Sequence, residues 1–492
     1  MSKSTAVFQP ETVHLDLDPR FYRPVKAASF PCHQLRYRNL EAAQAVGLER
    51  LSSVEWSQHF SHFTPLPGSL PEPLALCYHG HQFGHYNPEL GDGRGFLFAQ
   101  LRDDAGRLLD LGTKGSGTTP FSRTADGRLT LKGAVREILA TEMLEALGVN
   151  TSRSFSVFET GEALTRHDEP SPTRSAVLVR LSHSHIRIGS FQRLAYLDDS
   201  EGLEKLARHV ARHYYPALSG DSGLDADAPL AGLLPDLLEK VMLAIAGTVG
   251  QWLGSGFVHG VLNTDNFNIT GESFDYGPWR FLPQFDPSLV AAYFDQTGRY
   301  AYGRQSEAAL WAVCRLADCF LQLVEKDQLE ARLFGFYPAV EDSLTRQVCW
   351  RLGVCFGAAD ASVAKATVRA LFVAAKQSQY GFDQIFHDLY GGDPRCEGYD
   401  SDIWKPVLDN LAGATSLRPE ALEHPHFAAA KAVSMTIDEV EAIWAPIASD
   451  DDWHPLAVKI AQIRQMRAAL SGTAPSIMPD IIGGAIAPDG SG

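Results

Sequence analysis

The pattern of apolar and polar positions predicts strands before helices in the early part of the chain. Two apolar runs, Phe96–Leu101 and Leu108–Lys114, enclose a turn at Asp103–Gly106, which is typical of a β-hairpin. Apolar residues then recur at helical spacing over Leu131–Leu147, and Gly148 follows where a helix would stop. We therefore expect a hairpin followed directly by a helix.

Further along, the strand pattern ends and a helical pattern replaces it. The apolar runs Ser156–Phe158 and Ala176–Val179 predict strands that complete a small sheet. Two clear helices are expected over 203–218 and 234–253. Beyond Ser306 the chain is expected to be mostly helical to about residue 470, with an irregular interruption over 382–394. The pattern indicates an α+β fold in which a strand-rich lobe precedes a helical lobe.

Composition narrows the class of protein. With 492 residues, of which 45% are hydrophobic and 21% charged, the chain can bury a large core. Its seven cysteines include no C-x-x-C pair, which favours a reducing, cytoplasmic location. We expect no membrane span, because no apolar run approaches the ~20 residues that one requires. A net charge of −16 argues against nucleic-acid binding, so any phosphate chemistry must use a local cluster of Lys and Arg.

One segment carries a recognisable order of polar residues. His259-Gly-Val-Leu-Asn-Thr-Asp-Asn266 is followed nine residues later by Asp275. Kinase-like phosphotransferases carry H-G-D-x-x-x-x-N and then an aspartate, in which the first Asp orients the attacking hydroxyl and the last two polar residues hold Mg²⁺. Here Val261 stands at the position of that first Asp, whereas Asn266 and Asp275 keep the two metal positions. Each motif alone could be an ordinary turn.

The upstream sequence supplies the other parts of a nucleotide cleft in the expected order. A glycine-rich turn, Gly91–Gly95, precedes the hairpin and contains Arg94, and Lys114 ends the second strand. A strand-end lysine can be merely solvated, but in this order it is typical of phosphate binding. A helix glutamate must hold such a lysine, and both Glu137 and Glu142 are candidates that helical periodicity leaves open.

Several of these segments together resemble the SelO (YdiU) family: Lys114-Gly-Ser-Gly-Thr-Thr-Pro-Phe-Ser-Arg123, Asp126-Gly-Arg128, Arg136-Glu-Ile-Leu139, Asn263-Thr-Asp-Asn266 and Asp275-Tyr-Gly-Pro278. The resemblance implies a protein-kinase-like two-lobed fold with a small β-rich N-lobe and a larger, mainly helical C-lobe. It divides the chain into an N-terminal extension, an N-lobe, a C-lobe and a flexible tail, at 1–80, 81–190, 191–470 and 471–492.

The resemblance also implies roles for individual residues. Asp265 would act as the catalytic base, Glu137 rather than Glu142 would pair with Lys114, and Asn266 and Asp275 would bind Mg²⁺, with Mn²⁺ as an alternative. The expected ATP contacts are Gly91, Gly93, Arg94, Lys114, Asp126, Gly127, Arg180 and Arg187. Without the family, Arg180 and Arg187 would be interpreted as solvated arginines around a turn.

The implied activity is that of a protein adenylyltransferase, which passes AMP from ATP to Ser, Thr or Tyr hydroxyls of protein substrates and releases pyrophosphate. Two alternatives stay open: a silent nucleotide-binding pseudokinase scaffold and a kinase-like phosphotransferase. Family members often carry Cys or selenocysteine close to the C-terminus, whereas the last cysteine here is Cys396, which places redox control in doubt. His79, His81 and His85 are expected to have structural or loop roles. The sequence does not determine the oligomeric state.

Overall fold

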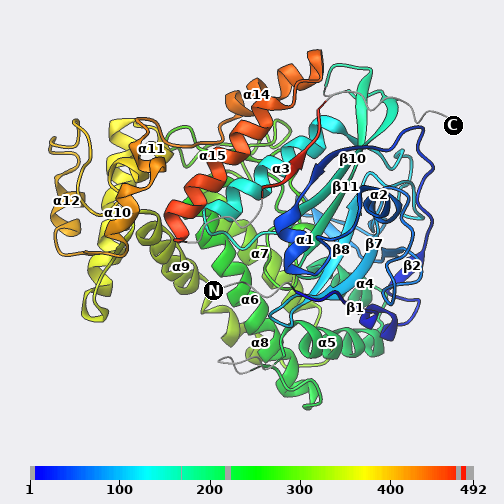
Figure 1. Ribbon diagram of the computed structural model, residues 1–492. Helices are drawn as coiled ribbons and strands as arrows, with labels where there is room; N and C mark the ends of the chain where they lie inside the picture. The colour runs from blue at the N-terminus through cyan, green and yellow to red at the C-terminus, as the bar shows by residue number, and fades with distance from the viewer. Residues whose placement is uncertain (1–5, 168, 217–222, 473–477, 484–492) are drawn as a thin grey trace.

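The computed structural model describes residues 6–167, 169–216, 223–472 and 478–483 (Figure 1). It has a mixed α+β architecture, as the apolar pattern predicts, built on one large antiparallel sheet. Its strands follow the order β16 (Asp480–Ile481), β3 (Gln34–Arg38), β10 (Arg153–Leu164), β11 (Thr173–Ser182), β8 (Leu108–Lys114), β7 (Leu97–Arg102), β4 (Leu74–Leu76) and β2 (Tyr22–Pro24). Two short strands join it at the side, β1 (Gln9–Glu11) on β7 and β9 (Leu129–Thr130) on β11.

The predicted hairpin is confirmed as β7 and β8, which pair Leu101 with Leu109. Its turn is held by Asp103, whose carboxylate accepts the main-chain N–H groups of Ala105 and Arg107. The predicted helix is confirmed as α3 (Leu131–Ala146), and Gly148 adopts a φ of 74°, a left-handed value that favours glycine at a helix end. Sequence and structure therefore agree on the central unit of the sheet.

Strands from the first 80 residues belong to the same sheet as the hairpin. β4 and β1 pair with β7, and β3 pairs with β10. Near the other end of the chain, β16 pairs with β3 inside the segment predicted as a flexible tail; residues 473–477 and 484–492 of that segment lie outside the described residues. Pairing between strands so distant in sequence leaves no periodic signal that a sequence could show.

The helices cover the sheet and extend away from it (Figure 1). α1 (Leu40–Ala45) and α2 (Ser53–Phe60) lie on one face, and α3 lies on the other. The remaining helices are α4 (Ile188–Tyr196), α5 (Ser200–Tyr214), α6 (Leu230–Ser255), α7 (Gln305–Asp318), α8 (Lys326–Leu333), α9 (Phe336–Arg351), α10 (Ala361–Ser378), α11 (Phe382–Asp388), α12 (Lys405–Leu411), α13 (Pro425–Ala428), α14 (Ile437–Asp450) and α15 (His454–Ser471). No described helix has the length and apolar content needed to cross a membrane.

Alternation along the strands separates two apolar cores. On β11, Val177 and Val179 pack with Trp56 of α2, whereas Leu178 packs with α3 on the opposite face. Successive side chains of a strand point to opposite faces, so a strand covered on both sides reads as a continuous apolar run. This is why the sequence predicts a strand here but does not reveal which helix covers each face.

One sequence prediction is wrong. The segment 382–394 was expected to be irregular, yet α11 occupies Phe382–Asp388. Its buried residues Phe382, Ile385 and Phe386 follow helical spacing and continue to Leu389. The glycines and proline that follow, at 391–394, mask this short amphipathic pattern.

The C-terminal helix α15 is fastened to α3 by a buried ion pair. The Arg464 side chain is 1% exposed, and its Nη2 lies 2.6 Å from Oε1 of Glu142. The Tyr37 hydroxyl on β3 donates to the same carboxylate at 2.7 Å. Three elements far apart in sequence thus meet at Glu142.

We expect Arg464→Ala to lower the free energy of unfolding by about 3–5 kcal/mol, because it leaves the Glu142 carboxylate buried without its cation. Arg50→Ala is the control, since the Arg50 side chain is 83% exposed and such a change is usually within about 0.5 kcal/mol. Thermal unfolding followed by circular dichroism measures both. Equal midpoints for the two variants would show that the α3–α15 ion pair does not hold these elements together.

Candidate active site

Lys114 lies inside the protein rather than at a solvated strand end. It is 3% exposed, and its Nζ lies 2.6 Å from Oε2 of Glu137 on α3 and 2.9 Å from Oδ1 of Asp275. Glu142, five residues beyond Glu137, faces another part of the protein and binds Arg464. The contact between Lys114 and Glu137 is the one that the family resemblance implies, and helical periodicity alone could not choose it.

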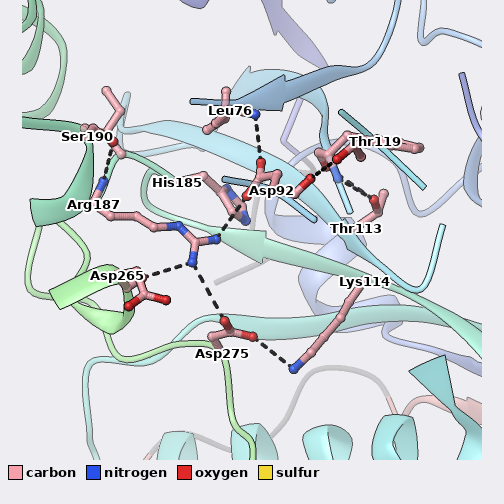
Figure 2. A network of polar contacts seen from close by, with 12 residues as sticks. Leu76, Asp92, Thr113, Lys114, Thr119, His185, Arg187, Ser190, Asp265 and Asp275 are labelled. Atoms are coloured by element: carbon pink, nitrogen blue, oxygen red, sulfur yellow. Dashed lines mark hydrogen bonds and ion pairs between the residues drawn. The ribbon is translucent and has the colours of Figure 1, made fainter. Parts of the chain in front are cut away.

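Asp275 is the point where three cations converge, two of which, Lys114 and Arg187, are seen in Figure 2. Besides Lys114, its carboxylate lies 3.4 Å from Nη2 of Arg180 and 3.8 Å from Nη1 of Arg187. Burial alone would raise the pKa of Asp275, but these three cations outweigh it and hold that pKa well below the usual range. Asp275 therefore stays ionised. Its backbone has a φ of 60°, an uncommon value for a residue other than glycine.

Both predicted arginines are buried, so neither is a solvated residue around a turn. Arg180 comes from β11, and its Nη1 lies 3.6 Å from Oε1 of Glu137. Arg187 precedes α4, and its guanidinium stacks 4.5 Å from the ring centroid of Tyr78. Among the described residues, the Nε atoms of both arginines have no hydrogen-bond partner. Each guanidinium thus keeps an unused donor.

Asp265 lies in a single 3₁₀ turn, η2 (Thr264–Asn266), beside this cluster. Its main-chain oxygen accepts from Nη1 of Arg187 at 3.0 Å, while its buried Oδ1 has no hydrogen-bond partner among the described residues. A Cβ built on Gly80 would lie 3.2 Å from that Oδ1, so glycine allows the close approach. Burial raises the pKa of Asp265 to about 6, although the Arg187 charge opposes the shift. Such a carboxylate can exchange a proton near neutral pH.

Asn266 and Asp275 are the predicted metal ligands. The Asn266 side-chain amide donates to the main-chain oxygen of Val261 at 2.9 Å, which fixes the amide plane. Within the described residues there is no group of three or more His, Cys, Asp or Glu side chains that could hold a metal ion. One carboxylate and one amide oxygen still fit a hard cation whose other ligands are water and phosphate oxygens, as is usual for Mg²⁺.

The glycine-rich segment is packed against a second loop. A Cβ on Gly91 would lie 2.3 Å from the Phe121 ring, and one on Gly93 would lie 3.0 Å from the Phe121 main-chain oxygen. Burial raises the pKa of Asp275, whereas the positive charges of Lys114, Arg180 and Arg187 and, to a smaller extent, of the exposed Arg94 lower it. The glycines therefore allow close contact between two loops.

Asp126 and Gly127 stand apart from the cluster. The exposed Asp126 carboxylate forms a two-pronged ion pair with Arg166, at 2.8 and 3.1 Å. Gly127 has a φ of 69°, and its main-chain oxygen accepts from Gly117 at 3.1 Å. Among the described residues, no hydrogen bond or ion pair links Asp126 to Lys114 or Asp275.

Asp92 is a site residue that the sequence reasoning missed. It is buried, its Oδ2 accepts the Leu76 main-chain N–H at 3.0 Å, and its Oδ1 lies 3.4 Å from Nη2 of Arg187 (Figure 2). Arg187 is therefore held between Asp92 and Asp275. In the sequence, Asp92 is marked only by its place between two glycines. Its spacing does not predict a contact with Arg187, which lies 95 residues away.

Fixed cations grouped around carboxylates are typical of enzymes that act on polyphosphates. Comparisons with known proteins are more specific. The family model described as protein adenylyltransferase SelO matches residues 4–464. A protein nucleotidyltransferase YdiU from Synechocystis sp. is 41% identical over 459 residues, covering 89% of this chain and 94% of that protein. Another, from Synechococcus elongatus, is 40% identical over 479 residues, with coverages of 91% and 93%.

The chain belongs to the SelO family of protein adenylyltransferases. Its class is that of a protein nucleotidyltransferase, for which ATP is the implied substrate.

Proposed function

We propose that this chain uses a kinase-like cleft to transfer AMP from ATP to Ser, Thr or Tyr hydroxyls of other proteins, with release of pyrophosphate. One observation carries the proposal. Asp265 is a buried carboxylate with a free oxygen beside the cation cluster, whereas Val261 occupies the position of the kinase base. Compared with the kinase motif, we place the base at Asp265 instead of at position 261, and we keep the metal positions at Asn266 and Asp275.

The buried cations Lys114, Arg180 and Arg187 would bind the phosphates. Lys114, Arg180 and Arg187 supply three positive charges whose present partners are carboxylates, and guanidinium groups bind phosphate with paired hydrogen bonds. Asp92 orients Arg187, and Glu137 orients Lys114. The family resemblance implies further nucleotide contacts at Gly91, Gly93, Arg94, Asp126 and Gly127, of which Asp126 pairs with Arg166 in the structure.

Asn266 and Asp275 would hold Mg²⁺, with Mn²⁺ as the alternative. When bound, such a cation neutralises charge on the phosphate oxygens and on the leaving group. In the structure the Asp275 carboxylate is neutralised by Lys114, Arg180 and Arg187. Bound phosphates would draw those cations away, which releases the Asp275 carboxylate for the metal.

Asp265 would accept the proton of the acceptor hydroxyl. The hydroxyl oxygen then forms a bond to the α-phosphorus, and the bond from that phosphorus to the oxygen bridging the α- and β-phosphates breaks. Pyrophosphate leaves with that oxygen, and AMP stays on the acceptor as a phosphodiester. A positioned base of this kind contributes typically ~10²–10⁴-fold to the rate.

Labelled ATP tests the proposed function directly. Protein labelled from α-labelled ATP and not from γ-labelled ATP is the expected result. Label from the γ-position only would identify a kinase-like phosphotransferase. Nucleotide binding without label from either position would identify a silent pseudokinase scaffold.

Asp265→Asn should reduce AMP transfer by ~10²–10⁴-fold, because the amide cannot accept the proton. Binding of Mg²⁺-ATP, measured by calorimetry, should change little. Asp275→Ala should abolish both transfer and metal-dependent binding, because the cation loses its carboxylate. If Asp265→Asn weakened binding as much as Asp275→Ala, Asp265 would be a metal or structural residue.

Arg187→Ala should raise the dissociation constant for ATP by about 10–100-fold, since a charge-assisted contact contributes roughly 1.5–3 kcal/mol. Arg193→Ala is a matched control on the same stretch of chain, because the Arg193 guanidinium donates to the main-chain oxygen of Arg20. Equilibrium binding of a fluorescent ATP analogue measures both variants. Unchanged affinity in Arg187→Ala would remove Arg187 from the phosphate site.

A further inference from the structure

Two adjacent aromatic side chains, Tyr293 and Phe294, project from the loop that follows β13 (Arg280–Phe281). They are 81% and 47% exposed, and their ring centroids lie 5.1 Å apart in an edge-to-face arrangement. Scattered single apolar residues are normal on a protein surface, but neighbouring exposed aromatic rings are a typical contact feature.

The loop that carries this pair is held firmly. Asp295 is buried, and its carboxylate accepts the main-chain N–H groups of Arg299 at 2.9 Å and Tyr300 at 2.7 Å. Its own N–H donates to the Ala292 main-chain oxygen at 3.0 Å. The two rings are thus presented to solvent by a fixed turn, which lowers the entropy lost when a partner binds.

The aromatic pair connects to the catalytic loop through further rings. Phe294 lies 5.8 Å from Phe83, and Phe83 lies 5.0 Å from Tyr300, measured between ring centroids. The Phe83 main-chain N–H and the Tyr300 hydroxyl both donate to Oδ1 of Asn263, at 3.0 and 2.8 Å. Asn263 is two residues before Asp265.

Phe83 also lies on the hairpin that covers Asp265. It follows β5 (Gly80–Gln82) and precedes β6 (His85–Asn87), and Gly80 at the start of β5 approaches the free Oδ1 of Asp265. His81 lies on the same hairpin, and its Nδ1 lies 2.8 Å from the Gln192 side-chain amide. A hydroxyl that reaches Asp265 therefore arrives beside this hairpin.

An arginine completes the surface. The Arg299 guanidinium stacks 4.9 Å from the Trp311 ring centroid, and its Nη1 would lie 3.5 Å from a Cβ on Gly84 at the hairpin tip. Aromatic residues and arginine are the residue types that dominate the binding energy of protein interfaces. We call Phe83, Tyr293, Phe294 and Arg299 the aromatic platform.

We propose that the aromatic platform docks the segment of the acceptor protein that flanks the modified hydroxyl, with an apolar side chain of that segment on the Tyr293–Phe294 pair. This inference rests on the proposed function. The acceptors of the family are proteins, and the platform is continuous with the loop that carries Asp265. A polypeptide whose hydroxyl is at Asp265 must continue over the surface next to it, and this surface is preformed and consists of aromatic rings with one arginine.

The test uses synthetic peptides with one central Ser, Thr or Tyr, in which each flanking position is varied in turn, together with α-labelled ATP. The full chain is compared with the double variant Tyr293→Ser/Phe294→Ser. The matched control is Phe334→Ser/Tyr337→Ser, which removes two exposed aromatic side chains near α8 and α9. Binding of ATP is measured for all three proteins, and casein serves as an unfolded protein acceptor.

We expect the unmodified chain to select an apolar residue at one flanking position. The platform variant should lose that selection and about tenfold in kcat/KM for the selected peptide, while it keeps its ATP affinity. The control should retain both. Unchanged selection in the platform variant, equal loss in the control, or label on casein but on no peptide would overturn the docking role.

Two other results have separate meanings. A change in the sedimentation of the free enzyme on substitution of the platform would show that it joins copies of the chain, which also overturns the proposal. Absence of α-label on casein and on every peptide, with ATP binding intact, would instead overturn the proposed function, and the docking role with it.

Discussion

Compensation of buried charge is the constraint on which this structure depends. Lys114, Arg180 and Arg187 are all nearly inaccessible to water, and each must meet an anion where the sheet joins the helices. Glu137 on α3, Asp275 on the loop after β12 (Phe257–Val258), and Asp92 in the glycine-rich turn provide those anions. The ion cluster therefore fixes six separate segments relative to one another.

Such a cluster is costly if it serves stability alone, because apolar side chains of similar size often stabilise a core at least as well. Under the proposed function, a bound ligand replaces some of these ion pairs. The phosphates of ATP would pair with Lys114, Arg180 and Arg187, and the Asp275 carboxylate would then bind the metal ion. Among the described residues, the Nε donors of both arginines and one carboxylate oxygen of Asp265 are buried without a hydrogen-bond partner, which is uncommon in a folded protein and calls for an explanation.

The C-terminal helix α15 stabilises the position of α3, which carries the lysine partner Glu137. α15 binds α3 through Arg464 and Glu142, and α3 carries Glu137 one and a half turns earlier. The position of the lysine partner is thus set by a helix that comes more than 300 residues later in the chain. A substitution at the α3–α15 contact would therefore alter the position of α3, and with it the Glu137 carboxylate that holds Lys114, although the substituted residue lies outside the site.

Short-range patterns in the sequence are enough to predict the local elements and the order of the polar motifs. Apolar periodicity predicted β7, β8 and α3, and the spacing of the polar motif picked out Asp275, which the structure places 2.9 Å from Nζ of Lys114. These succeed because backbone preference and side-chain alternation act over a few residues. The short helix α11 was missed because the glycine-rich segment after it obscured a pattern of only two turns.

Tertiary structure alone decided which charges meet. Glu137 and Glu142 are alike in sequence, and only the packing of α3 between the sheet and α15 turns one toward Lys114 and the other toward Arg464. The burial of Arg180 and Arg187, the role of Asp92 and the pairing of β16 with β3 are likewise contacts between distant segments. Local periodicity carries no record of such contacts, because the free energy that selects them arises when whole elements pack and buried charges must find partners.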